Sequence, residues 1–139
     1  MPDHTALMGD LVIARRILAK EGICDAFGHI SVRYPDNPER FFLARAVAPK
    51  LVTLGDIVEF NLDGTAVHND RKPFLERFIH GTLMAARPDV QSVVHSHSRG
   101  VIPFGITETQ IRPLLHSCGV LGHDIPVWDP VMCSGTPTC

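Results

Sequence analysis

Two histidines separated by one residue give the clearest chemical signal in this sequence, at the end of the run from Val93 to His97. Alternate residues of a β-strand project to the same face, so the imidazoles of His95 and His97 could reach one metal ion. The valines before them favour a strand, because on a helix the two side chains would diverge. The alternative is a polar strand end whose histidines meet only water or backbone, since such tripeptides also occur by chance.

A carboxylate upstream of this pair could complete a metal site. Glu76 lies in a segment with helical spacing that precedes the histidine strand, and a helix packed on a sheet can bring a carboxylate beside two imidazoles. Two nitrogens and one oxygen suit Zn²⁺, Mn²⁺ or a similar ion. His80, one turn later, could orient that carboxylate. The alternative for Glu76 is a solvated helix residue paired with Arg77 or Lys72.

A second polar set alternates with apolar residues between His29 and Tyr34. This alternation predicts a strand with His29, Ser31 and Arg33 on one face. The guanidinium of Arg33 matches carboxylate or phosphate, so this face could hold an anionic substrate group. An ordinary solvated strand face is the alternative. His116 follows Pro113 and two leucines, where a structural histidine near the core is the simpler interpretation.

The elements expected to position these residues are two helices and several strands. Spacing predicts helices over 7–18, with a stop at Gly22, and from Pro73 to before Pro88. Strands are predicted over 29–34, 41–44, 57–62, 91–98 and 120–128, with a turn at Asp63-Gly64. This order predicts an α+β or α/β/α layered domain around a mixed or antiparallel sheet.

Composition narrows the class of protein. The chain has 139 residues, 45% of them hydrophobic, and a formal net charge of −2, so we expect one compact domain without the positive field that nucleic acid requires. We find no apolar run long enough to span a membrane and no signal sequence, which predicts a cytoplasmic protein with no membrane partner. The four cysteines lack metal-type spacing and are expected to be reduced.

Taken together, these motifs resemble the class II aldolase and adducin family. The ordered match runs from about residue 7 to 128 and includes Gly28 to Arg33, Asn61 to Gly64, Glu76 with His80, and Arg87 to Ser98. The resemblance implies a three-layer α/β/α sandwich on a mainly antiparallel sheet, assembled as a homotetramer. It also implies a divalent metal, Zn²⁺ or Mn²⁺, bound by Glu76, His95 and His97, with Glu76 doubling as the acid/base group.

Two departures from the sugar-phosphate aldolases of this family indicate a different substrate. His29 stands where they have asparagine, and Phe74 and Leu75 stand where they have small hydroxyl residues that serve the phosphate. The segments Ala26 to His29 and Phe78 to His80 are similar to the decarboxylase branch of pyridine-dicarboxylate type.

The resemblance therefore implies a metal-dependent carbon–carbon lyase. It would decarboxylate an unphosphorylated hydroxy- or oxo-carboxylate through a metal-stabilised enolate, with His29, Ser31, Arg33 and His116 as substrate-binding candidates. One alternative is retro-aldol cleavage of a sugar or sugar phosphate. Another is a non-catalytic adducin-like interaction module or an inactive fragment.

The end of the chain departs from the family as well. We predict a single class II aldolase-type domain over residues 1–139 that lacks the C-terminal portion of the family, with an atypical tail at 130–139. The third metal-binding histidine of the family would lie in that missing portion.

Overall fold

The computed structural model describes residues 3–68, 71–122 and 125–127. The chain divides into two compact units, Met1–Arg99 and Gly100–Cys139, each of which is treated by itself. The assignment of residues 1–139 to a single domain stays a prediction. The tail at 130–139 lies outside the described residues.

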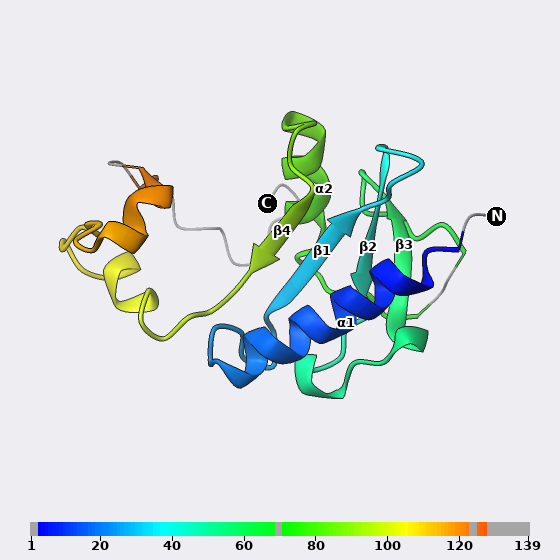
Figure 1. Cartoon of the computed structure of the whole chain (residues 1–139), viewed down its shortest axis with the longest axis horizontal. Helices are drawn as coiled ribbons and strands as arrows, with labels where there is room; N and C mark the ends of the chain where they lie inside the picture. Colours follow the sequence, from blue (N-terminus) through cyan, green and yellow to red (C-terminus); the bar gives the residue numbers. More distant parts are fainter. Residues whose placement is uncertain (1–2, 69–70, 123–124, 128–139) are drawn as a thin grey trace. The chain divides into compact units, whose positions relative to one another are not determined.

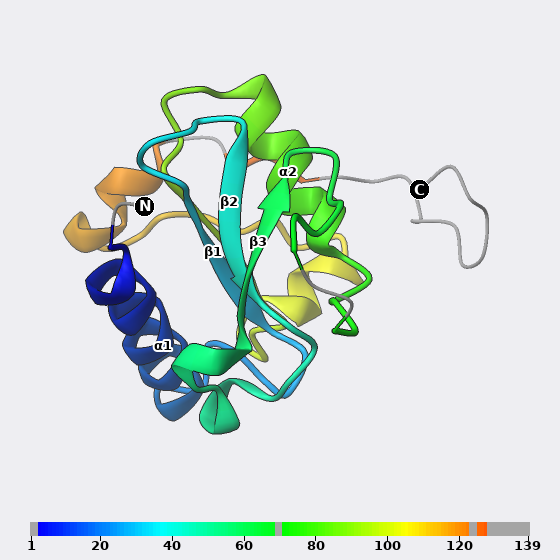
Figure 2. The ribbon, with the colours of Figure 1, turned by 90° about the vertical axis from the view of Figure 1, so that its right-hand side faces the viewer.

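The first unit is a four-stranded antiparallel sheet with a helix on each face. The strands are β1 (His29–Arg33), β2 (Arg40–Ala44), β3 (Ile57–Asn61) and β4 (Ser92–His95), in the order β3-β2-β1-β4. Helices α1 (Thr5–Lys20) and α2 (Arg77–Ala86) lie on opposite sides of this sheet (Figures 1 and 2). The predicted three-layer α/β/α sandwich on an antiparallel sheet is confirmed.

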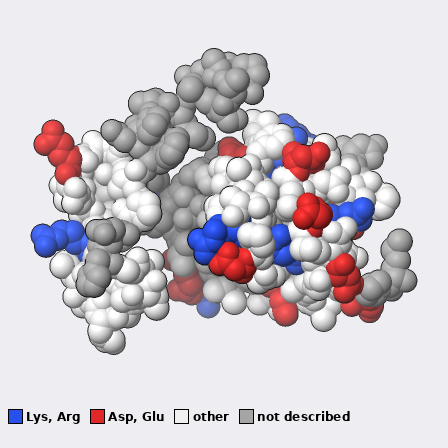
Figure 3. All heavy atoms as spheres, turned by 90° about the horizontal axis from the view of Figure 1, so that it is seen from above, with Lys and Arg blue, Asp and Glu red and all other residues white. Residues whose placement is uncertain are grey.

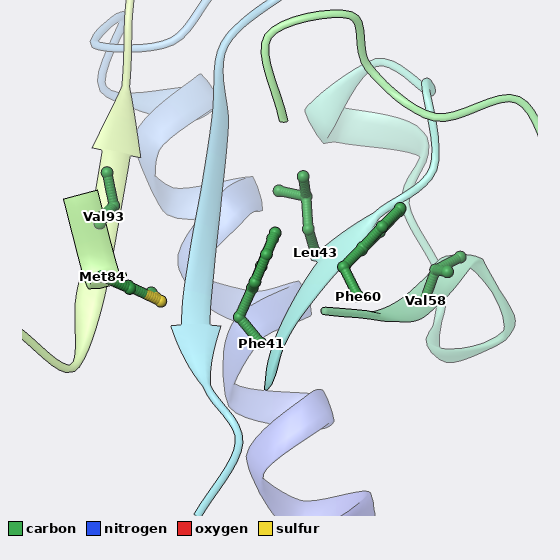
Figure 4. Packing of buried hydrophobic residues seen from close by; sticks show 6 residues of the cluster. All are labelled: Phe41, Leu43, Val58, Phe60, Met84 and Val93. Carbon is green, nitrogen blue, oxygen red and sulfur yellow. The ribbon is translucent and has the colours of Figure 1, made fainter. Parts of the chain in front are cut away.

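The apolar run of β2 is buried because both faces of the sheet are covered. Phe41 and Leu43 face α2, where they join a core cluster with Val58, Phe60, Met84 and Val93 (Figure 4). Ala44 points to the other face, where it packs with Val12 of α1 and with Val52. The sheet is thus packed on both sides. The histidines lie on its edge strand, β4, and on the neighbouring strand, β1.

Helix α1 and the turn after β3 form where the sequence predicts them. The chain leaves α1 at Gly22, whose φ of 71° lies in the left-handed region that glycine adopts most easily. Gly64 has a φ of 81°, and the N–H of Gly64 donates to the carbonyl of Asn61 in the turn after β3. Gly22 therefore ends the helix as predicted, and Gly64 lies in the predicted turn.

Helix α2 begins later than predicted, at Arg77 rather than Pro73. Residues 72–74 have no regular secondary structure and residues 75–76 form a turn, while the N–H of Ala46 donates to the carbonyl of Lys72. Glu76 is consequently the N-cap residue and not part of the helical face. This shift changes which neighbours its carboxylate can reach.

Strand β4 is shorter than the predicted 91–98 and ends at His95. His95 pairs with His29, the first residue of β1, so no partner strand continues beyond this point. His97 therefore lies in the segment after the strand.

The second unit contains two short 3-10 helices, η3 (Ile102–Gly105) and η4 (His116–Leu121). The prediction of a strand at 120–128 is wrong where the structure can be compared, because the chain is helical to Leu121 and turns at Gly122, which has a φ of 73°. Residues 123, 124 and 128 lie outside the described ranges.

Basic and acidic side chains lie interspersed on the face shown in Figure 3. Among the described residues, no helix combines the length and apolarity needed to cross a bilayer.

Candidate active site

The imidazoles of His95 and His97 converge at the end of β4. Their Nε2 atoms lie 3.1 Å apart. Two imidazole nitrogens that ligate one ion at metal–nitrogen distances near 2 Å are themselves separated by about 3 Å. The pair therefore has the separation that a shared divalent ion requires, although His97 is not in the strand.

Asp25 orients His97 through Nδ1, the ring nitrogen that does not face His95. The Nδ1 of His97 lies 3.2 Å from Oδ2 of Asp25, and an N–H donated there leaves the lone pair on Nε2, facing His95. Oδ1 of the same carboxylate accepts from the backbone N–H groups of Phe27 and Gly28, which fixes the loop. Sequence reasoning missed Asp25; the signal was an aspartate ahead of Gly28, a pattern typical of an Asx turn.

Close packing ties this loop to the histidine strand. The thiol of Cys24 donates to the carbonyl of His95 at 3.8 Å, and burial raises the pKa of this thiol, which keeps it a donor. A Cβ at Gly28 would lie 2.6 Å from the Cβ of Cys24, so only glycine fits there. The backbone of His95 is thus tied to the loop that precedes β1.

His29 packs against the pair from the neighbouring strand. Its ring stacks on that of His95 with centroids 4.8 Å apart and contacts the ring of Phe74 at 4.5 Å. Its Nδ1 lies 2.6 Å from Nε2 of His80. The Nδ1 of His80 in turn lies 2.7 Å from Oγ of Ser31. His29, Ser31 and His80 are each at most 1% exposed, so the polar face of β1 is buried rather than solvated.

Burial keeps these imidazoles neutral. It lowers the pKa of His29 to about 3 and that of His80 to about 4, with nearby positive charges adding to the effect. The pKa of His95 is also lowered, first by burial and then by His97, while the carboxylate of Glu76 acts in the opposite direction. Neutral imidazole is the form that binds a metal ion.

Glu76 approaches the cluster from the start of α2. Its Oε2 lies 3.9 Å from Nε2 of His29, a buried nitrogen that has no hydrogen-bond partner in the described part of the chain. The side chain of Glu76 is 46% exposed, so its carboxylate lies between solvent and the buried imidazoles.

The fit to a divalent ion is therefore good for two of the three predicted ligands. His95 and His97 come together, and Glu76 lies close enough for its charge to act on His95. Within residues 3–68, 71–122 and 125–127, no three His, Cys, Asp or Glu side chains are already grouped as a metal would group them. Completing the set requires the half-exposed carboxylate of Glu76 to turn from His29 toward the pair.

Arg33 does not belong to this cluster, which corrects one expectation. Its guanidinium donates to the carbonyls of Pro38, Met84, Arg87 and Val90. Two of these carbonyls lie at the C-terminal end of α2, where a positive charge is favourable. Arg33 thus links α2 to β1, and its guanidinium N–H groups donate to backbone carbonyls rather than to a ligand.

His80 also differs from its predicted role. Its two ring nitrogens are taken by His29 and Ser31, so it has none left to orient the carboxylate of Glu76. The reason is the late start of α2, which puts His80 over the sheet and leaves Glu76 outside the helical face. His116 lies in the second unit, and its substrate role stays a prediction.

Acid should destabilise the fold through His80. An unfolded histidine has a pKa of 6.5, whereas burial lowers that of His80 to about 4, so the unfolded state binds more protons between these values. The free energy of unfolding should fall as the pH drops from 6.5 to 4, by about 3 kcal/mol from this residue. Urea unfolding at several pH values tests this, and the His80→Gln variant should show a flatter slope. Equal slopes would contradict a neutral, buried His80.

Comparison with known proteins identifies the family of this chain. The family described as Class II Aldolase and Adducin N-terminal domain matches residues 9–136. The chain belongs to the class II aldolase and adducin family. The resemblance inferred from the motifs is confirmed.

Proteins similar to this member of the class II aldolase and adducin family include decarboxylases. The chain is 40% identical over 116 residues to Decarboxylase tropJ of Talaromyces stipitatus, a match that covers 81% of this chain and 44% of that protein. It is 28% identical over 130 residues to the 3,4-dihydroxyphthalate decarboxylase of Arthrobacter keyseri, covering 86% and 51%. The chain thus spans about half the length of these curated relatives.

A solved structure supports the class II aldolase fold. The aldolase II superfamily protein from Pseudomonas syringae superposes with a TM-score of 0.74 at 27% identity, covering 88% of this chain and 51% of that one. The fold is therefore shared with a solved structure of an aldolase II superfamily protein.

Proposed function

We propose that this chain carries the metal site of a carbon–carbon lyase that decarboxylates an unphosphorylated hydroxy- or oxo-carboxylate. The observation that carries the proposal is the 3.1 Å separation of the two Nε2 atoms of His95 and His97, with Glu76 beside them. Two relatives whose names describe decarboxylases support the reaction, and one of those names specifies a dihydroxyphthalate.

The resident ion is proposed to be Zn²⁺ or Mn²⁺, held by His95, His97 and Glu76. When bound, such an ion supplies positive charge that stabilises the electrons left as a carbon–carbon bond breaks. His97 is already oriented for this role by Asp25, and His95 by its strand.

The side chains have separate tasks in the reaction. The bond from the substrate carbon to its carboxylate breaks, the electron pair stays on that carbon, carbon dioxide leaves, and a proton takes its place. Glu76 is proposed to hold and deliver that proton, because its carboxylate is half-exposed and beside the imidazoles. His29 is proposed to bind a substrate oxygen through Nε2, the ring nitrogen for which the described residues provide no hydrogen-bond partner.

The chemistry of the neighbouring side chains supports a substrate without phosphate. Phe74 is buried and packs on His29, and Leu75, which precedes Glu76, is 78% exposed. Neither side chain has a donor for phosphate oxygens.

Product analysis tests the proposal. The purified chain, supplied with Zn²⁺ or Mn²⁺, is incubated with 3,4-dihydroxyphthalate and with 2-hydroxybenzoate, and products are identified by mass spectrometry. Release of carbon dioxide without an aldehyde is expected. An aldehyde formed from a sugar phosphate, with no decarboxylation, would favour retro-aldol cleavage. Bound metal with neither reaction would favour a non-catalytic module or an inactive fragment. A homotetramer, implied by the resemblance, and a cytoplasmic location, expected from the sequence, complete the proposal.

A further inference from the structure

Three buried side chains form a continuous hydrogen-bonded chain that ends at the candidate site. It runs from Oγ of Ser31 to Nδ1 of His80, 2.7 Å, and from Nε2 of His80 to Nδ1 of His29, 2.6 Å. None of the three residues is more than 1% exposed. The far end is Nε2 of His29, which lies 3.9 Å from the carboxylate of Glu76.

The direction of these two hydrogen bonds decides whether Nε2 of His29 presents an N–H or a lone pair to a ligand. A neutral imidazole carries one N–H and one lone pair, so the two hydrogen bonds must run the same way. If Ser31 donates to His80, then His80 donates to His29, and the hydrogen of His29 is on Nε2. If the bonds run the other way, Nε2 of His29 presents a lone pair.

Two observations favour the first direction. In the opposite direction His80 would donate to Ser31, and the buried hydroxyl hydrogen would need another acceptor; in the described part of the chain its hydrogen-bond partner is His80. The opposite direction would also aim a lone pair of His29 at the carboxylate of Glu76, which is repulsive, whereas an N–H there is attractive.

We propose that Ser31 and His80 fix His29 as its Nε2–H tautomer, so that the site presents a buried N–H donor to an anionic oxygen of the substrate. His29 is then the residue that contacts the ligand, and Ser31 and His80 are positioning residues. This inference rests on the proposed function for the identity of the ligand. It deepens that function by giving the site a preference for a carboxylate or ionised hydroxyl over an amide.

The preference follows from the chemistry of a fixed donor. An N–H whose direction is set by buried neighbours needs no reorganisation to bind an oxygen anion, and its interaction is strengthened by the low dielectric of the site. An amide NH₂ group in the same place would put donor against donor. Without Ser31, the ring of His80 could carry its hydrogen on either nitrogen, and His29 would no longer be held in one tautomer.

Nuclear magnetic resonance tests the tautomer without any need for turnover. The full chain, with ¹⁵N-labelled histidine and added Zn²⁺, is examined at pH 7 through the couplings of ring nitrogens to ring carbon-bound hydrogens. The His29→Gln and His80→Gln variants assign the two rings. We expect the hydrogen on Nε2 in both His29 and His80. A hydrogen on Nδ1 of His29 in the wild-type chain would overturn the proposal, even if the chain proves to be a decarboxylase.

Binding of two matched probes tests the consequence. The wild-type chain should bind 2-hydroxybenzoate more tightly than 2-hydroxybenzamide, and Ser31→Ala should reduce that ratio by about tenfold, the equivalent of one lost charge-assisted hydrogen bond. Ser92→Ala is the control, because Ser92 donates to the backbone carbonyl of Ser31 and not to the imidazoles. It should leave the ratio unchanged.

An unchanged ratio in a folded Ser31→Ala variant would contradict the proposal. If that variant fails to fold, the tautomer of His29 in the wild-type chain still decides the question. Absence of decarboxylation with the expected tautomer and binding ratio would instead count against the proposed function.

Discussion

Replacing Glu76 with glutamine should lower the rate of carbon dioxide release by about a thousandfold, the middle of the range for a lost acid/base group. The change removes the proton-carrying group but keeps the size of the side chain. Since Glu76 is 46% exposed and lies at the N-cap, the fold should be little affected. The rate is measured with metal added to saturation, so that weaker metal binding does not limit it.

The same substitution at Glu59 is the control for this experiment. Glu59 forms an ion pair with Arg40 at 2.7 Å, between β3 and β2 and away from the histidines. Glu59→Gln should leave the rate unchanged. A Glu76→Gln variant with nearly full activity at saturating metal would show that another group handles the proton.

Replacing Gly81 with alanine should destabilise the fold by about 3 kcal/mol or more, because an added Cβ has no space. That atom would lie 2.0 Å from the carbonyl oxygen of Leu62 and 2.8 Å from its carbon. Both are backbone atoms of the residue that follows β3, so α2 itself would have to move. Since α2 carries His80 and follows Glu76, the site should be displaced as well. The urea midpoint of unfolding measures the effect.

Gly9 provides a matched control within the same chain. It lies inside α1, and an added Cβ would meet nothing within 4 Å. Gly9→Ala should therefore stabilise the protein by about 0.5 to 1 kcal/mol, through helix propensity alone. Equal urea midpoints for the two variants would contradict the close packing of α2 on Leu62.

Much of the fold could be predicted from local sequence because the deciding interactions are local. The apolar run at Phe41 to Ala44, the stripe of α1 and the stop at Gly22 each follow from residue type and spacing. The approach of His95 and His97 was predictable for the same reason. Only His95 lies in the strand, however, and His97 lies in the segment after it.

The rest depended on contacts between distant segments. Ahead of α2, the backbone N–H of Ala46 donates to the carbonyl of Lys72, a contact between distant segments that no periodicity reveals. Alternation in β1 was visible, but a polar face can be buried only if its groups find partners. Those partners, His80 for Ser31 and four carbonyls for Arg33, come from α2, from the segment that follows it and from the turn between β1 and β2. The sequence therefore indicated which residues share a face and not what that face meets.

Metal content of the purified chain tests the central claim most directly. Elemental analysis is performed on the wild-type chain after equilibration with Zn²⁺ or Mn²⁺ and removal of excess ion, with His95→Ala beside it. His4→Ala is the control, since His4 pairs with Asp36 instead of the histidine cluster. We predict close to one ion per chain in the wild type and in His4→Ala, and almost none in His95→Ala. A wild-type chain that retains no ion, or a His95→Ala variant that retains as much as the wild type, would contradict a metal centre at His95 and His97.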